Sequence, residues 1–423
     1  MVFRKYRAVK QWGKMDTRIF KEIYNARNKR KMPSFKIPEA VQAIGAKVYE
    51  TNDPFLFTEQ AKENNAFDEV FQKSSDIQYN SSLQDHPLYQ NELAHVYESS
   101  EALSDGIAQA SILTNSVTRN TLPEAILNHS HLEIEEEAVR DAILHGEKYD
   151  PTLEKLPKRF DPVLFWVTHP RVHGTPVIKR NNIILNNLMR QITFAGLRSG
   201  ILKSNLQINR DEPLSAILKT NSFKHPLVIR GQPHLTIHST DPIVNAPWAG
   251  KIDVKEASEE SLPDIYPISP FIDLQKESIY NPENLITRST QNVNLHSILW
   301  AREQDAKYPW TREQNMANAI MMTYAAAVAN ATRNGNKTIE KPMLVRGVQL
   351  VNGRLDLVAI QLNTLDTANG ENPTKNIVWF EKGLRLYKPK PYYEQMTEVE
   401  NLNMDVFKKL TSLMLGFGSP HNH

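Results

Sequence analysis

Apolar side chains recur at three- and four-residue steps in several parts of the chain, which is the spacing of one buried helix face. The clearest stripe consists of Ile184, Leu188, Ile192 and Ala195. It predicts a helix over 181–199 that ends at Gly200. Similar stripes predict helices after Ser100, after Pro123, and around 406–415.

The most apolar stretch of the chain predicts a buried helix that opens at Thr311. Gln314, three residues later, has the spacing of a capping box, and Asn334-Gly335 can supply a left-handed cap. The Ala-rich surface between them is apolar nearly all round, which favours burial. The run 316–331 is interrupted by polar residues and is too short to cross a bilayer, so no membrane span is expected.

An Asn-Gly pair at 352–353 separates two alternating runs and predicts a β-hairpin with a type I′ turn. Pairing outward from the turn sets Leu350 opposite Leu355 on one face and Gln349 opposite Asp356 on the other. The first face is expected to be core throughout. The second is expected to be covered only at the end far from the turn.

Further runs predict strands at 233–240, 377–380 and 384–387. Strands and helices do not alternate in a repeating strand–helix–strand rhythm. The predicted fold class is therefore α+β, with mixed helices, a largely antiparallel sheet in the C-terminal half, and a basic N-terminal arm.

The chain has 423 residues, enough for two or three packed units. We expect five segments: a basic arm or presequence at 1–32, an extended wrapping segment at 33–85, a mostly helical domain ending in strands at 86–240, a connector at 241–270, and an α+β domain with the Asn-Gly hairpin at 271–423. The connector is rich in proline and acidic residues, which makes it the best candidate for a domain boundary.

Composition narrows the function mainly by exclusion. The chain has no cysteine, which removes disulfides, zinc fingers, iron–sulfur clusters and thiol catalysis. The glycine-rich phosphate loops, the nucleophile elbow of hydrolases and the metalloprotease helix motif are all missing from the sequence. No cofactor and no metal are therefore expected.

The net charge of +2 conceals an uneven distribution. Residues 1–32 hold eleven Lys and Arg against Asp16 and Glu22, and 158–230 also carry a net +9, so the remainder carries −16. Such clusters favour a polyanionic partner, although a solvated basic face would look the same. The candidate RNA-contacting residues are Arg4, Lys5, Arg7, Arg27, Lys29, Arg30, Lys31, Lys158, Arg159, Lys179 and Arg180.

The basic arm has a second interpretation. Val9, Trp12 and Met15 follow three-residue steps among Lys and Arg, as in an amphipathic mitochondrial presequence. Asp16, Glu22 and the scarcity of serine weigh against a presequence. An arm that lies along RNA has the same composition, so both interpretations stay open.

An enzymatic alternative centres on the predicted hairpin. Some magnesium nucleases carry Asp on one strand and Glu-x-Lys on the next, where carboxylates hold the ion and lysine polarises the attack. Here Asp356 is followed by Gln361-Leu362-Asn363, so the second carboxylate and the lysine are missing. Gln361 and Asn363 are expected to hydrogen-bond neighbouring backbone, with RNA as the alternative.

Several short strings in order along the chain carry a family resemblance. They are HPLY at 86–89, LPKR at 156–159, YPISPFIDL at 266–274 with Ile-Tyr at 279–280, and QLNT at 361–364 followed by KNIVW at 375–379. Together they resemble the family of mitochondrial ribosomal large-subunit protein thirty-seven, which is specific to metazoan mitoribosomes. The resemblance covers about 85–415. Both prolines of YPISP fix φ, so this string is expected to be a rigid extended connector.

The resemblance implies a structural component of the mitochondrial large ribosomal subunit, located in the matrix, that supports mitochondrial translation without catalysis. Its implied partners are large-subunit rRNA, other large-subunit proteins, and the related mitoribosomal protein historically numbered thirty of the small subunit. The alternatives are an active or inactive metal-dependent nuclease-like protein, or an RNA-binding adaptor outside the ribosome.

Overall fold

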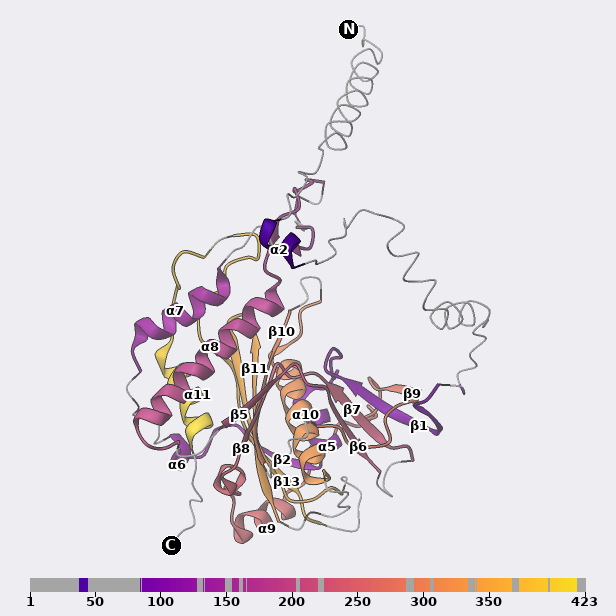
Figure 1. Cartoon of the computed structure of the whole chain (residues 1–423). Coiled ribbons are helices and arrows are strands. Elements are labelled where there is room, and N and C mark those ends of the chain that lie inside the picture. Colours follow the sequence, from indigo (N-terminus) through magenta and orange to yellow (C-terminus); the bar gives the residue numbers. More distant parts are fainter. Residues whose placement is uncertain are drawn as a thin grey trace. The chain divides into compact units, whose positions relative to one another are not determined.

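The computed structural model describes residues 38–44, 84, 86–127, 132, 134–148, 154–159, 163–164, 166–202, 206–219, 224–286, 293–304, 308–333, 339, 341–366, 373–394 and 396–416. The chain divides by its contacts into Met1–Asn80 and Ser81–His423. The described part of the first unit contains helix α2 (Glu39–Ala43). The basic arm 1–32 and most of 33–85 lie outside the described residues. All further elements belong to the second unit (Figure 1).

A seven-stranded sheet forms the centre of the second unit. Its strands are, in order, β2 (Ser116–Arg119), β13 (Asn376–Arg385), β12 (Arg354–Leu362), β11 (Met343–Val351), β10 (Asn294–Arg302), β8 (Leu235–Ser239) and β5 (Leu206–Arg210). The pairs β2–β13 and β10–β11 are parallel, and the other four pairs are antiparallel. The predicted largely antiparallel sheet and the α+β class are confirmed.

A second, four-stranded sheet is smaller. Its strands are, in order, β6 (Leu214–Leu218), β7 (Leu227–Gly231), β1 (Tyr89–Glu98) and β9 (Gln275–Ile279). The central pair β1–β7 is parallel, and both outer pairs are antiparallel.

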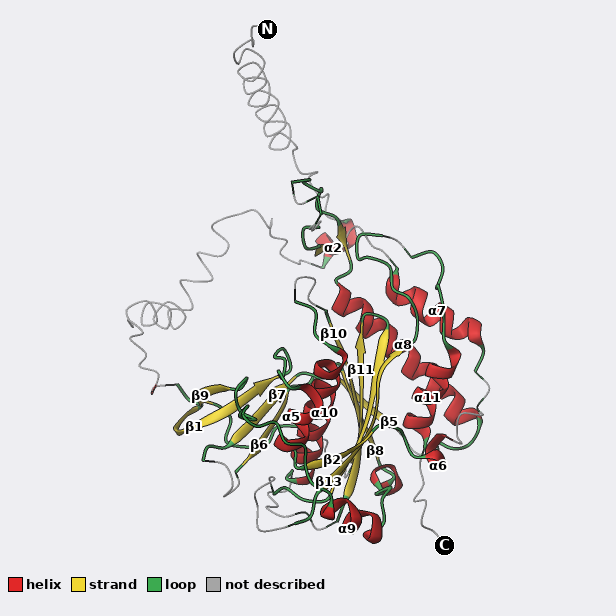
Figure 2. Ribbon diagram, turned by 180° about the vertical axis from the view of Figure 1, so that it is seen from behind, coloured by secondary structure: helices red, strands yellow, loops and turns green. Residues whose placement is uncertain are grey.

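Helix α10 (Arg312–Ala331) lies between the two sheets, with α5 (Gly106–Leu113) beside it (Figure 2). The side chains of Thr311 and Gln314 form the predicted capping box, and every residue from Asn315 to Ala329 is buried. The helix packs closely on both sides: a Cβ at Gly347 of β11 would overlap Thr323 Oγ1, and one at Gly231 of β7 would displace the end of the Met322 side chain. The predicted buried helix is confirmed.

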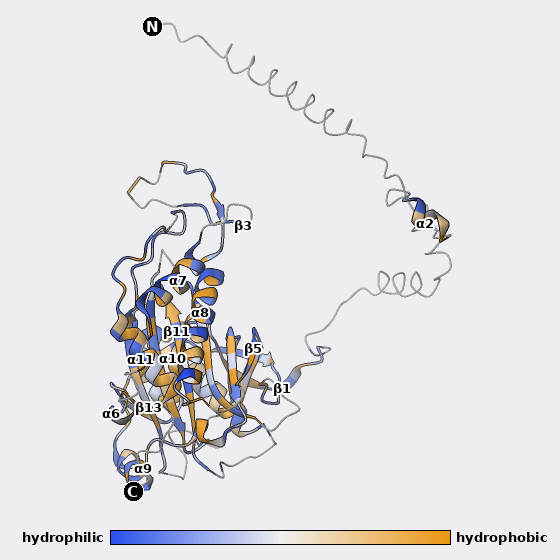
Figure 3. Ribbon diagram, turned by 60° about the vertical axis from the view of Figure 1, so that its left-hand side comes forward, coloured by the Kyte–Doolittle hydropathy of each residue, from blue (hydrophilic) through white to orange (hydrophobic). Residues whose placement is uncertain are grey.

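Three further helices cover the opposite face of the seven-stranded sheet. They are α7 (Glu136–Glu147), α8 (Val177–Arg198) and α11 (Met404–Leu415), with the short α6 (Glu124–Leu127) against α11. The predicted stripe of α8 is buried, although the helix begins at Val177 rather than Asn181. The unit is therefore layered as helices, large sheet, α10 with α5, and small sheet, with two clusters of buried apolar side chains between the layers. Hydrophobic residues predominate along the strands of the large sheet and along α10 (Figure 3).

The hairpin has the predicted register, with Leu350 opposite Leu355 and Gln349 opposite Asp356. The turn at 352–353 has positive φ at both residues, as type I′ requires. The expectation that one face is covered only far from the turn is wrong, because Gln349 and Asp356 are also buried. Helix α10 covers this end, and Gln349 Nε2 donates to the Asn315 carbonyl at 3.1 Å.

Residues 376–385 form one strand rather than the two predicted. Gly383 has a φ of +62°, and the register between β12 and β13 shifts between Leu355 and Leu357. The local irregularity lets the strand continue where the sequence pattern alone indicates a break.

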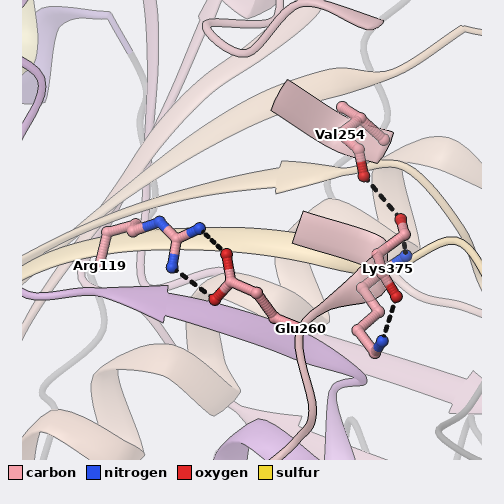
Figure 4. A network of polar contacts seen from close by, with 5 residues as sticks. Arg119, Val254, Glu260 and Lys375 are labelled. Atoms are coloured by element: carbon pink, nitrogen blue, oxygen red, sulfur yellow. Dashed lines mark hydrogen bonds and ion pairs between the residues drawn. The ribbon is translucent and has the colours of Figure 1, made fainter. Parts of the chain in front are cut away.

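The structure differs from the predicted boundary at 241–270. This segment contains the 3₁₀ turn η3 (Pro242–Asn245) and helix α9 (Lys251–Glu259), and β8 and β10 on either side of it are neighbours in one sheet. Helix α9 packs through Ala257 on β2 and β13. Three polar contacts hold it there (Figure 4). Arg119 pairs with Glu260, the backbone N–H of Lys375 donates to Ser258 Oγ at 3.2 Å, and the Lys375 ammonium donates to the Ser258 carbonyl.

The YPISP string is not extended as expected, because residues 266–273 form consecutive turns docked against α5. Ser104 donates from both its backbone N–H and its hydroxyl to the Asp273 carboxylate, each at 2.7 Å. Gln109 Nε2 donates to the Pro270 carbonyl at 2.9 Å. The string is therefore part of the packed unit.

Candidate nucleic-acid interface

A short two-stranded ribbon carries two of the predicted RNA-contacting residues. Strands β3 (Glu154–Lys155) and β4 (His173–Gly174) pair antiparallel, and we call the described residues 154–159, 163–164 and 166–174 the ribbon (Figure 3). Leu156 is buried, and its N–H donates to the Val172 carbonyl at 2.9 Å. The base of the ribbon is thus anchored by one apolar side chain and a short ladder of backbone hydrogen bonds.

Lys158 and Arg159 lie just beyond this anchor. The Arg159 guanidinium sits over the Tyr393 ring, 4.2 Å from its centroid, and the Tyr392 hydroxyl donates to the Pro157 carbonyl at 3.2 Å. Lys158 is exposed, whereas Arg159 is half-buried. The aromatic pair therefore holds Arg159 in one orientation and leaves the Lys158 ammonium in solvent.

The other two predicted residues of this region have structural partners. Lys179 pairs with Glu154 at the base of the ribbon. Arg180 is buried, and its Nη1 donates to Glu147 Oε2 at 2.8 Å. The interpretation of Arg180 as an RNA contact is wrong, because its guanidinium faces α7 in the interior rather than solvent.

The remaining predicted contacts belong to the N-terminal arm. Arg4, Lys5, Arg7, Arg27, Lys29, Arg30 and Lys31 lie outside the described residues. Their contact with RNA stays a prediction.

Lys155, Arg171 and His173 are exposed on the same ribbon and were not predicted. Lys155 and His173 are cross-strand partners, so they lie together at its base. Two-residue strands leave no periodic signal, and only the pairing brings 155 close to 173. With Lys158 and Arg159, these side chains make the ribbon a basic projection.

The far end of the ribbon exposes apolar side chains. Val163 is 75% exposed and Trp166 is 65% exposed, and Leu164 and Val167 are also exposed. Lys and Arg contact phosphates, and an aromatic ring offers a face on which an unpaired base can stack. The ribbon therefore carries cationic groups that can contact phosphates and an aromatic ring on which a base can stack.

The surroundings of Asp356 do not support an active nuclease site at this residue. Its carboxylate is buried in the sheet, where Oδ1 accepts from the Gly383 N–H at 2.7 Å and Oδ2 accepts from Gln349 Nε2 at 3.2 Å. Burial raises the pKa of Asp356 to about 6. Gln361 binds both backbone groups of Ala249, and Asn363 donates to the Lys375 carbonyl, so both amides hold backbone as expected.

The two described histidines four positions apart on β8 and just before it have different surroundings. His234 Nδ1 lies 2.9 Å from Asp211 Oδ1, whereas His238 is buried and burial lowers its pKa to about 4. Among the described residues, no three His, Asp or Glu side chains converge as metal ligands. Among the described helices, none combines the length and the apolar character of a membrane span.

Comparison with known proteins supplies relatives, although no family model matches the chain. The chain is 25% identical over 356 residues to large ribosomal subunit protein mL37 of Rattus norvegicus, covering 79% of this chain and 77% of the relative. It is 26% identical over 321 residues to mL37 of Bos taurus, and the match covers 72% of this chain and 69% of that relative. The chain is also 26% identical over 353 residues to mL37 of Gallus gallus, and the match covers 78% of this chain and 76% of that relative. These relatives confirm the resemblance carried by the ordered strings.

Proposed function

We propose, from this similarity to mL37 proteins, that the chain is a non-enzymatic structural component of the mitochondrial large ribosomal subunit. The observation that carries the proposal is the extent of the similarity, which spans more than two thirds of this chain and of each relative. The interior supports it: Asp356, Gln361 and Asn363 hold backbone and neighbouring side chains instead of facing a substrate.

The proposed rRNA contact is made by the ribbon. Lys155, Lys158 and Arg171 are exposed cations, and Arg159 is oriented by Tyr393. Such groups recognise the phosphate backbone and carry little sequence information. The basic residues of the arm 1–32 are proposed to add phosphate contacts when the arm is retained.

The proposed location is the mitochondrial matrix, where the chain supports translation. Its proposed protein partners are other large-subunit proteins and the related mitoribosomal protein numbered thirty. A layered unit with two sheets suits a scaffold, because cores of this kind are rigid and hold surface loops in fixed positions.

Sedimentation of a mitochondrial lysate that contains the tagged full chain tests the proposal. The chain should travel with large-subunit rRNA in a sucrose gradient at high magnesium. A tagged matrix enzyme of similar mass, run in parallel, should stay at the top. Finding this chain at the top, or in an RNase-sensitive particle without large-subunit rRNA, would reject the ribosomal role, and the second result would favour an RNA-binding adaptor.

A further inference from the structure

The exposed side of α8 and the neighbouring strand β5 form one surface of mixed apolar and basic character, which we call the α8–β5 surface. It comprises Ile183, Arg190, Phe194, Leu197, Arg198 and Ile208. Phe194 is 48% exposed and Leu197 is 53% exposed. Large apolar side chains gathered on one exposed face are typical of a protein-binding site.

The two elements of this surface are held in register. The chain turns at Gly200 and returns in β5, where Arg210 Nη2 donates to Asn186 Oδ1 of α8 at 3.2 Å. Leu206 is partly buried and packs against the core cluster that includes the buried face of α8, so Ile208, two residues on in the strand, points to the same side. The contact between Arg210 and Asn186 fixes how far along α8 each strand residue lies. Ile208 comes two strand residues before Arg210, a distance of roughly 6.6 Å, which equals the rise of about four helical residues. Ile208 therefore lies level with Arg190, four residues after Asn186.

The charged side chains that α8 contributes to the surface are all positive. Helix α8 contains no Asp or Glu along Val177–Arg198. Arg190 and Arg198 are exposed, and among the described residues no carboxylate pairs with either. A partner that covers this face is favoured if it brings acidic groups.

Strand β5 is the last strand of its sheet. Within the described part of the chain it pairs only with β8, so its outer edge presents backbone N–H and C=O groups in extended geometry. An edge of this kind accepts an extended segment by strand addition, in which backbone hydrogen bonds supply affinity and alternate side chains supply specificity.

We propose that the α8–β5 surface docks an extended, acidic segment of a partner protein. The segment adds a strand to β5, places apolar side chains against Ile208 and Phe194, and pairs its carboxylates with Arg190 and Arg198. Nucleic acid would not use the apolar side chains or the strand edge. A second copy of the chain would bring arginines against arginines. The proposal uses none of the ribbon residues and does not depend on the ribosomal role.

The test uses the purified full chain and a fluorescein-labelled synthetic peptide of about ten residues, the length of a long strand. Ser occupies every second position, and Val and Glu alternate in the positions between, so that both kinds of side chain face α8. Binding is measured by anisotropy. Arg190→Glu should weaken it by about fivefold or more, with Arg385→Glu as the matched control, because Arg385 is also exposed and lies outside both the ribbon and the α8–β5 surface. A peptide of the same composition with its Glu and Val residues in separate blocks should bind more weakly.

The decisive variant is Ile208→Lys, with Ile252→Lys on α9 as the matched control, because Ile252 is also exposed. Lysine adds positive charge, so simple attraction to an acidic peptide would tighten binding. Strand addition over an apolar side chain predicts weaker binding instead. Phe194→Ser should weaken binding as well, and circular dichroism checks that each variant is folded.

Three results would overturn the proposal. The first is no binding of the alternating peptide up to about 1 mM, or equal or tighter binding to Ile208→Lys. The second is a loss of labelled oligouridine binding in Arg190→Glu while peptide binding is unchanged, which would assign the surface to RNA. The third is a dimer in sedimentation velocity that Ile208→Lys dissociates, which would assign the surface to a second copy.

Discussion

Arg180 and Glu147 form an ion pair in the protein interior, with Arg180 Nη1 2.8 Å from Glu147 Oε2 and both side chains almost fully buried. The Tyr387 hydroxyl donates to the other oxygen, Oε1, also at 2.8 Å. Burial and the neighbouring Glu147 carboxylate keep the pKa of Tyr387 well above its usual value. The three side chains join α7, α8 and the segment that follows β13.

Replacing the buried cation should be costly. Arg180→Met is expected to lower the free energy of unfolding by about 3–5 kcal/mol, because it leaves Glu147 buried without its cation. Urea denaturation measures this loss. Lys179→Met is the matched control, since the Lys179–Glu154 pair is exposed and should contribute less than about 1 kcal/mol. Equal losses in the two variants would contradict a structural role for Arg180.

A double variant separates the missing charge from the missing contacts. Arg180→Met combined with Glu147→Leu removes both charges, so it should be more stable than Arg180→Met alone. If the double variant is less stable than the single one, the unpaired carboxylate is not the origin of the loss.

The exposed cations of the ribbon should act on RNA affinity and not on stability. Lys158→Gln and Arg171→Gln should each weaken binding to single-stranded RNA and reduce the slope of log affinity against log salt by about 0.7. Lys408→Gln on α11 is the matched control, since Lys408 is also exposed. Filter binding at several salt concentrations measures the slope. Slopes that match the wild type would mean that these side chains do not contact phosphate.

The hairpin turn should tolerate no side chain at its second residue. Gly353 has a φ of +69°, and a Cβ there would lie 2.5 Å from the Tyr387 carbonyl oxygen. Gly353→Ala is therefore expected to cost about 2–4 kcal/mol, the sum of left-handed strain and overlap. Gly200 has a φ of +72° with open space around it, so Gly200→Ala should cost only about 1–2 kcal/mol. Thermal unfolding compares the two, and equal shifts would argue against the close approach.

Asp356 should give the fold a distinctive pH dependence. Its pKa, which burial raises to about 6, lies above the ordinary value near 3.9 of an unfolded chain. The folded state then holds the proton more tightly, so this contribution to stability is full below pH 4 and is lost as the pH rises through about 6. Relative to Asp356→Asn, the wild-type free energy of unfolding should fall by up to about 3 kcal/mol between pH 4 and 7. Parallel pH profiles for the two proteins would show that Asp356 does not titrate in this way.

Local patterns predicted the parts of the fold that local chemistry determines. The register around 352–353 follows from one Asn-Gly pair and two alternating runs, and the buried stripe of α8 follows from helical spacing. The burial of Gln349 and Asp356 could not be predicted in the same way. It depends on α10, which covers this part of the hairpin from another layer.

In the candidate interface, too, some features follow from the local sequence and others depend on contacts with distant residues. Arg180 and Lys179 are neighbours in a basic pair, and nothing local distinguishes them. The difference comes from Glu147, 33 positions earlier, and from Tyr387 beyond β13, both of which reach Arg180 only in the folded chain. The ribbon could not be predicted from the sequence either, because its strands are only two residues long. The orientation of Arg159 depends on Tyr393, which lies far away in the sequence.

A density map of the large ribosomal subunit, purified from mitochondria that contain this chain, tests the proposed role most directly. The proposed role predicts density that fits the layered unit of two sheets as one body, with Lys155, Lys158 and Arg171 of the ribbon against rRNA phosphates. A map that accounts for every protein of the particle and leaves no density for this unit would contradict the ribosomal role.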